Sequence, residues 1–291
     1  MNEWQAATAT LCRLQLGSEL RRIRTDAGLT STQVVRRLLW SPSKLTRLET
    51  GDNVTVEPSD IMALCQVYKV DEETAEQLKE YAFVTKKKQD WWEAKKYRSV
   101  IGPGPKALLG LESSATALQS YNSEYVPGLL QTAEYVRVLH QHAHGGRSGT
   151  DIDRMVELRM KRQAVLHRDP PLKLTVVLNE SVLLRQVGGS EVMRPQLARI
   201  VEAASAPNVK VQVIPFASGV YRAMNGSFTS LRFRGDTALK PIVCLEHLAD
   251  HWVLRRQADV ELYEEAFNEL QALAPGPRES LSMIERAMEE L

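Results

Sequence analysis

The apolar residues at the start of the chain recur at helical spacing, and two stop signals interrupt them. In residues 16–51 the first pattern ends at Gly28, and the second begins at Thr30, with glutamine three residues later. That pairing is a capping-box pattern, in which the threonine side chain closes a helix N-terminus. The third pattern begins at Ser41, which is followed by proline at the first helical position. Three short helices are therefore predicted.

The third helix carries a thin apolar stripe, Leu45 and Leu48, and its other side chains are mainly polar or basic. Such a helix can anchor to its own domain on one side and reach base edges on the other. Residues 13–49 hold eight basic and three acidic residues, a local net charge of +5, whereas the whole chain is only +1. We therefore predict a helix-turn-helix that binds duplex DNA. A small helical domain with a solvated basic face would give the same pattern.

Two more helical patterns follow, and a basic, aromatic segment comes after them. Pro58 opens a fourth helix and Asp71 caps a fifth, so residues 1–84 are expected to form a five-helix, all-α domain. Residues 85–98 carry six basic and two acidic residues, with Trp91 and Trp92 among them. A nucleic-acid contact is one interpretation. We favour a linker, residues 85–107, whose helix docks its tryptophans on the second domain while its lysines stay solvated.

From about residue 108 the pattern changes to strands that alternate with helices. After a short helix and a strand that ends near Tyr121, the sequence predicts strands at 172–179, 209–216, 226–234 and 241–248, and helices at 129–143, 151–167, 191–204, 258–273 and 277–291. This order predicts one α/β domain at residues 108–291 with a parallel or mixed sheet. The strands at 227–234 and 241–248 could form an antiparallel pair.

The segments AGLT, WSPSKLTRLETG and VEPSDIMAL resemble the Cro/repressor, or XRE-type, helix-turn-helix family. The resemblance covers about residues 15–70 and is closest to actinobacterial members. It implies that Ser43, Lys44 and Arg47 face the bases of duplex DNA. It also implies that Arg24 and Glu49 form a structural pair, which ties the first helix to the recognition helix.

The same resemblance implies contacts to DNA phosphates from Arg21, Arg22, Ser31 and Thr46. For the two arginines, a solvated helix face is the alternative. Ser31 stands where the family usually has glutamine, which puts that one contact in doubt. Leu39 stands where the turn usually has glycine, so some backbone strain is expected there.

The second half of the chain also resembles a known class. The runs VPGLLQTAEYVRVL, RMKRQAVL, NVKVQVIPF and NGSFTSLRF are similar to the C-terminal domain of actinobacterial regulators of the WhiJ-like class. Proteins of that class are antitoxin-like and are paired with a small protein encoded beside them, of which the BldB type is an example. The resemblance therefore implies a small partner protein, and it implies no catalytic residues.

Composition narrows the cellular setting. Hydrophobic residues make up 43% of the chain, yet no apolar run approaches the ~20 residues that cross a bilayer. The N-terminus has neither the basic start nor the apolar core of a signal peptide. Cys12, Cys65 and Cys244 lie far apart without a CxxC motif, so neither a disulfide framework nor a zinc site is indicated. A cytoplasmic, nucleoid-associated protein without membrane contact is expected.

Several clusters could carry chemistry, but each has a simpler explanation. His140, His142 and His144 could bind a metal, although a solvated helix end is the better interpretation. His247, Asp250 and His251 could form an acid–base site, yet no nucleophile motif accompanies them. The helix at 151–167 mixes acidic with basic residues, which suggests ion pairs. Its basic residues could instead line a pocket for an anion, and they are Arg154, Arg159, Lys161 and Arg162. No catalytic residue, metal or cofactor is predicted.

The loop at 219–228 is the best candidate for a ligand or partner site in the second domain. It follows a strand and presents Tyr221, Arg222, Met224 and Asn225. Loops at the carboxyl ends of strands are where α/β sheets bind ligands. A plain connection is the alternative.

The last stretch of the chain, residues 261–291, has a net charge of −6. It could either keep the protein soluble or dock a partner of complementary charge.

Together these features predict a DNA-binding transcriptional regulator rather than an enzyme. One helix-turn-helix reads few base pairs, so we expect a homodimer on an inverted-repeat operator. The second domain is expected to bind a small, BldB-like partner protein that modulates DNA binding. Three alternatives remain open: a domain that senses a small molecule, an antitoxin-like protein that acts mainly by protein binding, and an enzyme with a DNA-binding module.

Overall fold

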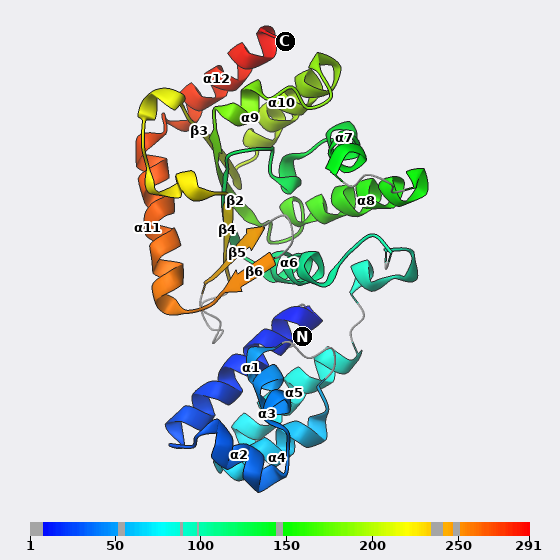
Figure 1. The fold of residues 1–291 in the computed structure, drawn as a ribbon, viewed down its shortest axis with the longest axis vertical. Coiled ribbons are helices and arrows are strands. Elements are labelled where there is room, and N and C mark those ends of the chain that lie inside the picture. The colour runs from blue at the N-terminus through cyan, green and yellow to red at the C-terminus, as the bar shows by residue number, and fades with distance from the viewer. Residues whose placement is uncertain are drawn as a thin grey trace. The chain divides into compact units, whose positions relative to one another are not determined.

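The computed structural model describes residues 8–51, 56–87, 90–97, 99–143, 148–233, 241–246 and 251–291. The chain divides into two compact units: the chain up to Glu93 and, later in the sequence, Phe233 belong to the first, and the second begins at Ala94. The first unit is helical and the second combines helices with a mixed sheet (Figure 1). The predicted fold class is therefore confirmed.

Five α-helices form the described part of the first unit, as the sequence predicts. They are α1 (Ala9–Asp26), α2 (Ser31–Leu38), α3 (Pro42–Thr50), α4 (Pro58–Tyr68) and α5 (Glu72–Lys87). Their buried apolar side chains meet in one core, to which α1 contributes Leu16 and Leu20 and α4 contributes Ile61 and Leu64. Cys65 is buried on α4, as its place in the apolar pattern predicts.

Local signals set the ends of α2 and α3. The backbone N–H of Thr30 donates to Gln33 Oε1 at 2.8 Å, and the N–H of Gln33 donates to Thr30 Oγ1 at 3.3 Å, which completes the predicted capping box. Ser41 accepts from the N–H of Lys44 at 3.3 Å and caps α3. Between the two helices, Leu39 has φ of 54°, the left-handed conformation that glycine adopts more easily. The strain expected at this turn is thus present.

Gly17 lets α1 approach α3 closely. A Cβ atom at this position would lie 2.6 Å from the carbonyl oxygen of Leu48 and 2.8 Å from that of Glu49. Both of those atoms belong to backbone, which cannot move aside without shifting the helix. Any side chain at position 17 would therefore push the end of α3 away from α1. The orientation of α3 depends on this contact.

The segment before the second unit differs from the predicted linker helix. It forms two single 3-10 turns, η2 (Trp91–Glu93) and η3 (Lys95–Tyr97). Trp92 is buried, and both tryptophans belong to the first unit. Tyr97 belongs to the second unit, where its hydroxyl donates to Glu157 Oε1 at 2.9 Å. The predicted linker helix is therefore wrong for residues 91–97, where the chain forms 3-10 turns instead.

The second unit alternates strands and helices in the predicted order. Its strands are β1 (Ala117–Asn122), β2 (Lys173–Asn179), β3 (Val209–Ile214), β4 (Phe228–Arg232), β5 (Ile242–Glu246) and β6 (His251–Leu254). Its α-helices are α6 (Pro103–Ser114), α7 (Ala133–Ala143), α8 (Gly149–Arg162), α9 (Ser181–Leu184), α10 (Ser190–Ala204), α11 (Gln257–Leu273) and α12 (Pro277–Glu289). Short 3-10 turns lie between them: η4 (Gly128–Leu130), η5 (Gln163–Leu166), η6 (Phe216–Ser218) and η7 (Arg222–Asn225).

Two helix boundaries differ from the prediction for a physical reason. The helix expected at 129–143 begins only at Ala133, because Gln131 is extended and its amide donates to the carbonyl of Val126 at 2.7 Å. The helix expected at 151–167 ends at Arg162 and continues as η5. Gln163 donates from its side chain to the carbonyl of Gln131 at 2.7 Å, so the two irregular segments hold each other.

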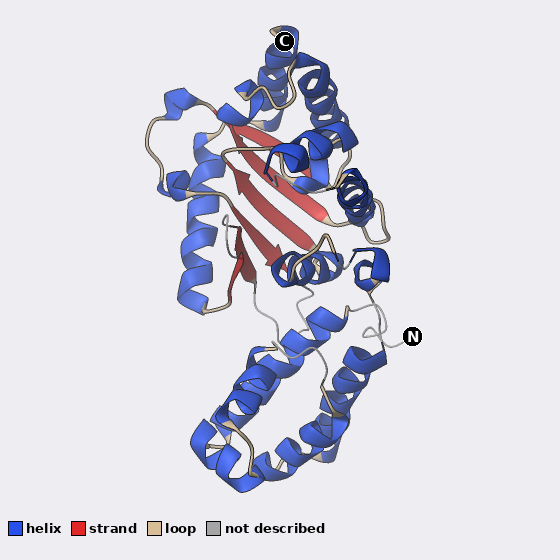
Figure 2. Ribbon diagram, turned by 45° about the vertical axis from the view of Figure 1, so that its right-hand side comes forward, coloured by secondary structure: helices blue, strands red, loops and turns tan. Residues whose placement is uncertain are grey.

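The sheet is mixed, with strand order β3-β2-β1-β4-β5-β6 (Figure 2). The pairs β1–β2 and β2–β3 are parallel, and β1–β4, β4–β5 and β5–β6 are antiparallel. The expected antiparallel pair is confirmed as β4–β5, in which Ser230 lies opposite Val243. The sequence did not predict β6, which is only four residues long.

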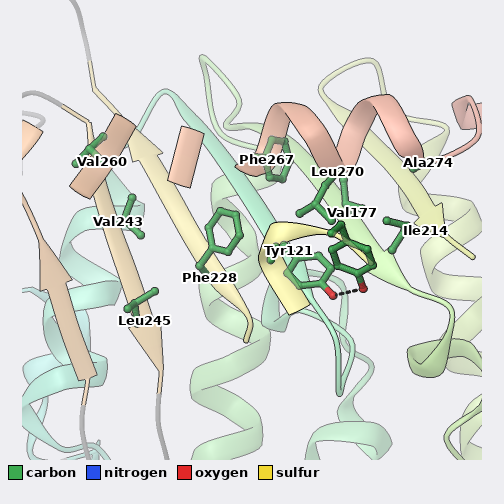
Figure 3. Packing of buried hydrophobic residues seen from close by; sticks show 12 residues of the cluster. Tyr121, Val177, Ile214, Phe228, Val243, Leu245, Val260, Phe267, Leu270 and Ala274 are labelled. Atoms are coloured by element: carbon green, nitrogen blue, oxygen red, sulfur yellow. Dashed lines mark hydrogen bonds between the residues drawn. The ribbon is translucent and has the colours of Figure 1, made fainter. Parts of the chain in front are cut away.

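Helices cover both faces of the sheet. In Figure 1, α11 lies on one side, and α6, α7 and α8 lie on the other. Side chains alternate along β1, so Tyr121 points into the cluster under α11 while Ser120 and Asn122 face the opposite side. Figure 3 shows that cluster, in which Phe228 packs edge-on against Phe267 with ring centroids 6.3 Å apart. Among the described helices, none is long and apolar enough to cross a membrane.

Candidate DNA-binding interface and surfaces of the second unit

Helix α3 buries the side chains on one of its faces and exposes those on the opposite face to solvent. Leu45 and Leu48 are almost fully buried, whereas Ser43, Thr46 and Arg47 are exposed. The helix α2, the turn at Leu39 and the helix α3 form a helix-turn-helix, of which α3 is the second helix. In such motifs the second helix enters the major groove. The outward side chains are small or basic, which suits contact with base edges and phosphates.

The three exposed side chains of α3 differ in how far they are already engaged. Thr46 Oγ1 donates to the carbonyl of Pro42 at 3.0 Å, and Ser43 Oγ lies 3.1 Å from Ser41 Oγ. The Arg47 guanidinium makes no hydrogen bond or ion pair with any described residue. Arg47 is therefore the member of this set that can turn to a base without breaking a contact.

Lys44 is held within the first unit. Its Nζ lies 2.7 Å from Asp60 Oδ1 on α4 and 4.1 Å from the centroid of the Trp40 ring. The lysine thus neutralises a carboxylate that would otherwise face the DNA-binding side chains. Sequence reasoning missed Asp60, because nothing in the α4 pattern signals that its first turn reaches α3.

Arg24 and Glu49 form a bidentate ion pair between α1 and α3. Arg24 Nε lies 2.6 Å from Glu49 Oε1, and Nη2 lies 2.9 Å from Oε2. The side chains are only 12% and 8% exposed. The hydrogen bond to Glu49 raises the pKa of Arg24, against the opposing effect of burial. Arg24 Nη1 also donates to the carbonyl of Leu29 at 2.9 Å, so one guanidinium joins α1, the start of the turn before α2, and α3.

The four residues expected to contact phosphates are all exposed, but the two arginines among them differ in their ion pairs. Arg22 pairs with Glu19 at 2.7 Å and with Asp26 at 2.9 Å on its own helix. The Arg21 side chain makes no hydrogen bond or ion pair with the described residues. Ser31 is the first residue of α2. Two adjacent arginines, Arg36 and Arg37, are also exposed in the last turn of α2. They contribute to the net charge of residues 13–49 but were not predicted as DNA contacts.

The candidate loop of the second unit is anchored at two points. Tyr221 is buried, and its hydroxyl lies 2.8 Å from that of Tyr121 (Figure 3) and accepts from Asn179 Nδ2 at 2.8 Å. Arg222 pairs with Glu265 of α11 at 3.0 Å and with Glu269 at 3.6 Å. The structure thus turns Tyr221 inward and leaves other loop residues outside.

Large apolar side chains stand exposed on this anchored loop and on η6 just before it. Phe216 is 59% exposed, Val220 89% and Met224 56%. Asn225 is exposed beside them. Ordinary surfaces carry single exposed apolar residues, whereas three within residues 216–224 make this segment a candidate interaction surface. Sequence reasoning found Met224 but not Phe216 or Val220, because an apolar residue near a strand end is usually buried.

The charged residues of α8 divide between the two expected roles. Arg154 pairs with Asp151 at 3.1 Å, and Asp153 pairs with Arg137 of α7 at 2.6 Å. Glu157 accepts from Tyr97 and from Lys96. Arg159 and Arg162 instead line a cavity beside the sheet. Ion pairs and a pocket are therefore both present on one helix.

The structure describes only some of the histidines in the two candidate clusters. His142 is exposed, and its Nδ1 lies 3.0 Å from the carbonyl of Val138, as expected near a solvated helix end. His140 lines the cavity instead, so that interpretation is wrong for His140. His144, His247 and Asp250 lie outside the described residues, as does the His251 side chain. In the part of the chain that the structure describes, no group of three or more potential ligands could hold a metal.

Two family models match the chain. Residues 15–78 match a model described as "Helix-turn-helix domain", which fits the geometry of α2 and α3. The class of protein is therefore a helix-turn-helix DNA-binding protein of the transcription-regulator type. Residues 105–286, more than half of the chain, match the model "Domain of unknown function (DUF5753)", and the chain belongs to this family. Comparison with curated proteins and with solved structures finds no match.

The Arg24–Glu49 pair generates a stability prediction. Glu49→Ala should lower the free energy of unfolding of the first unit by about 3 kcal/mol, because it leaves the Arg24 charge shielded from water without its partner. Glu19→Ala is the matched control, since it removes one partner of Arg22, an exposed arginine on α1 that also pairs with Asp26, and should cost ~0–1 kcal/mol. Urea unfolding of both variants measures the difference. Equal losses would show that the pair does not hold α1 to α3.

Proposed function

We propose that this chain is an XRE-type transcriptional regulator that reads its operator through α3. The observation that carries the proposal is the free, exposed Arg47 on a helix that two devices fix in place, namely the Gly17 contact and the Arg24–Glu49 pair. Arginine is the side chain that most often reads guanine in the major groove. Ser43 and Lys44 contribute further base contacts, and for Lys44 this requires release from Asp60.

Arg21, Arg22, Ser31 and Thr46 contact backbone phosphates in this proposal. Such contacts fix the register of a protein on DNA without reading its sequence. Arg21 supplies the stronger contact of the two arginines, because Arg22 already balances two carboxylates on α1. Arg36 and Arg37 add basic charge at the end of α2.

The roles of Arg47 and Arg21 are separable by experiment. Arg47→Ala should weaken operator binding by about 1–3 kcal/mol and relax specificity at one base pair. Arg21→Ala should weaken binding to operator and random duplex alike, and should reduce the steepness of the salt dependence by about one unit. Fluorescence anisotropy at several salt concentrations, after operator selection in vitro, gives both quantities. Identical profiles for the two variants would contradict the assignment.

We further propose a homodimer on an inverted repeat. One helix-turn-helix covers too few base pairs to stand out among competing genomic sites. Two-fold symmetry would place two α3 helices about 34 Å apart in successive major grooves. Light scattering of the free protein and of its complex with the selected operator tests this, and a monomer in both states would refute it.

We propose that the second unit binds a small partner protein. In this proposal the domain spans residues 108–291 and follows a linker at residues 85–107. The WhiJ-like, antitoxin-like character implied by sequence resemblance supports a BldB-type partner encoded beside the gene, in a cytoplasmic, nucleoid-associated setting. The exposed loop supports the location of the contact, because Phe216, Val220 and Met224 offer apolar anchors on a fixed backbone.

Charge next to the loop indicates what kind of partner fits. Arg222 is the basic residue of the loop, and it is already balanced by Glu265 and Glu269. Residues 261–291 carry a net charge of −6, and Glu265 and Glu269 bring part of this charge beside the loop. A partner with an apolar patch surrounded by basic residues matches this arrangement.

The partner proposal predicts a loss of binding from loop changes. The double variant Val220→Glu/Met224→Glu should weaken binding of the neighbouring gene's purified small protein at least about tenfold, because it puts carboxylates where apolar anchors are needed. Lys210→Glu is the matched control, since it alters the net charge by the same −2 at the exposed start of β3. Calorimetry measures both affinities. Equal binding by wild type and the double variant would place the contact elsewhere.

Partner binding should also change operator affinity, because linked binding equilibria act in both directions. Titration of the partner into the protein–operator complex reports this coupling. If the partner binds while operator affinity stays constant, the second unit only tethers the partner.

A further inference from the structure

A cavity of about 310 Å³ lies between the sheet and the helices on the side opposite α11. Its walls come from α6, β1, the turn before α7, α7, α8, β2, β4 and β5. The volume is at the lower end of the range for small-molecule sites, which are usually largely preformed. Leucine side chains make up the apolar part of the wall, and they are Leu108, Leu118, Leu129, Leu139 and Leu174.

Two arginines reach this cavity, and only one of them has a carboxylate partner. Arg162 is held by Glu112, with Nε 2.8 Å and 2.9 Å from the two carboxylate oxygens and Nη2 2.6 Å from Oε2. Glu112 is 1% exposed, so this pair is a fixed part of the wall. Arg159 makes no hydrogen bond or ion pair within the described part of the chain. Burial, and then the Arg162 charge, lower the pKa of Arg159 to about 10.

The backbone makes room for the Arg159 guanidinium. A Cβ atom at Gly128 would lie 2.3 Å from Arg159 Nη1 and 3.2 Å from Arg162 Nη1. The absence of a side chain at position 128 therefore allows both guanidinium groups to enter the cavity. An unpaired, partly buried cation costs stability, so a protein that keeps one in a cavity has reason to pair it with something.

A second polar group of the cavity also lacks a partner. Gln131 is 2% exposed, and its Oε1 accepts no hydrogen bond from the described residues, although its amide donates to Val126. Buried acceptors without donors are uncommon in native proteins. Glu246 lines the same cavity, where it accepts a hydrogen bond of 3.4 Å from Tyr125. Its negative charge opposes a dianion, so one unpaired arginine and one carboxylate favour a ligand of single negative charge.

We propose that this cavity binds a small organic monocarboxylate, with its carboxylate on Arg159, a donor group at Gln131 and its apolar body against the leucines. Arginine binds carboxylates through two parallel hydrogen bonds, which fits a guanidinium free of other partners. Arg159 is partly exposed and Glu246 is exposed, so the cavity reaches solvent at that end. The site lies on the face of the sheet opposite the α11 cluster and does not rest on the proposed partner contact.

Thermal unfolding of the full chain tests the site without DNA or partner. Phenyllactate and hexanoate are the probes, and each is compared with its neutral primary amide. At concentrations near ten times the dissociation constant, a carboxylate should raise the Tm by about 3–5 °C, and its amide should not. If neither carboxylate raises the Tm more than its amide, or if inorganic phosphate acts as strongly, the proposal is overturned.

Four variants locate the effect. Arg159→Gln should abolish the ligand-dependent shift while leaving the ligand-free Tm equal or higher, because it removes a cation without a partner. Gly128→Ala should also abolish the shift, since its methyl group displaces the flexible Arg159 end rather than backbone. Arg154→Gln is the control on the same helix, because Arg154 pairs with Asp151 and does not line the cavity. Glu246→Gln should strengthen binding of the carboxylates about two- to fivefold, since it removes the opposing charge.

A merely structural Arg159 gives the opposite result. In that case Arg159→Gln lowers the ligand-free Tm, and any shift caused by the carboxylates persists. Ligand-observed NMR on the same variants checks that a change in Tm reflects binding, since saturation transfer to phenyllactate should disappear with Arg159→Gln and remain with Arg154→Gln.

Discussion

The position of α3 depends on how closely α1 can approach it. Gly17 sets the distance, because only a residue without Cβ lets the two backbones meet. The Arg24–Glu49 pair then ties the C-terminal end of α1 to the C-terminal end of α3. The apolar stripe of α3 is too narrow to do this alone, since Leu45 and Leu48 are its buried side chains. A recognition helix must expose most of its surface, and these two devices replace the packing that it gives up.

In the second unit, β1 plays the corresponding part. It pairs with β2 in parallel and with β4 in antiparallel, so the two halves of the mixed sheet meet at this strand. Its alternation sends Tyr121 to the aromatic cluster under α11, and sends Ser120 and Asn122 to the charged cavity. One strand therefore separates a well-packed core, which fixes the candidate partner loop through Tyr221, from an open polar face.

The features that sequence predicted well are those encoded within a few residues. The capping box at Thr30 and the Ser41 cap each depend on neighbours along the chain. The strained turn at Leu39 was instead expected from the family resemblance. The β4–β5 pair was also predictable, since its strands follow one another. Arg24 and Glu49 lie 25 residues apart, and only resemblance to a family brought them together. β6 has four residues, too few for a period to be recognised.

The cavity could not be predicted, because its parts are far apart in the chain. Glu112 and Arg162 are separated by 50 residues, and nothing in either local pattern announces their ion pair. From sequence, Arg159 and Arg162 lie on one predicted helix that mixes acidic and basic residues, and this pattern fits either ion pairs or a pocket. Which explanation holds for each arginine depends on whether a carboxylate from another element reaches it.

Three arginines show how the same side chain acquires different roles from its surroundings. Arg24 is mostly buried and fully paired, so its charge contributes to structure. Arg47 is exposed and unpaired within the described residues, so water hydrates it at little cost until a phosphate or base replaces that water. Arg159 is partly buried and forms no hydrogen bond or ion pair with those residues, and the charges of Glu246 and Glu112 offset its burial only in part, so neither water nor protein fully compensates its charge. Of the three, Arg159 gains most from an added anion, because an anion there replaces neither a good hydration shell nor an existing partner. That difference in compensation, rather than the count of basic residues, is what separates a structural arginine from a binding one.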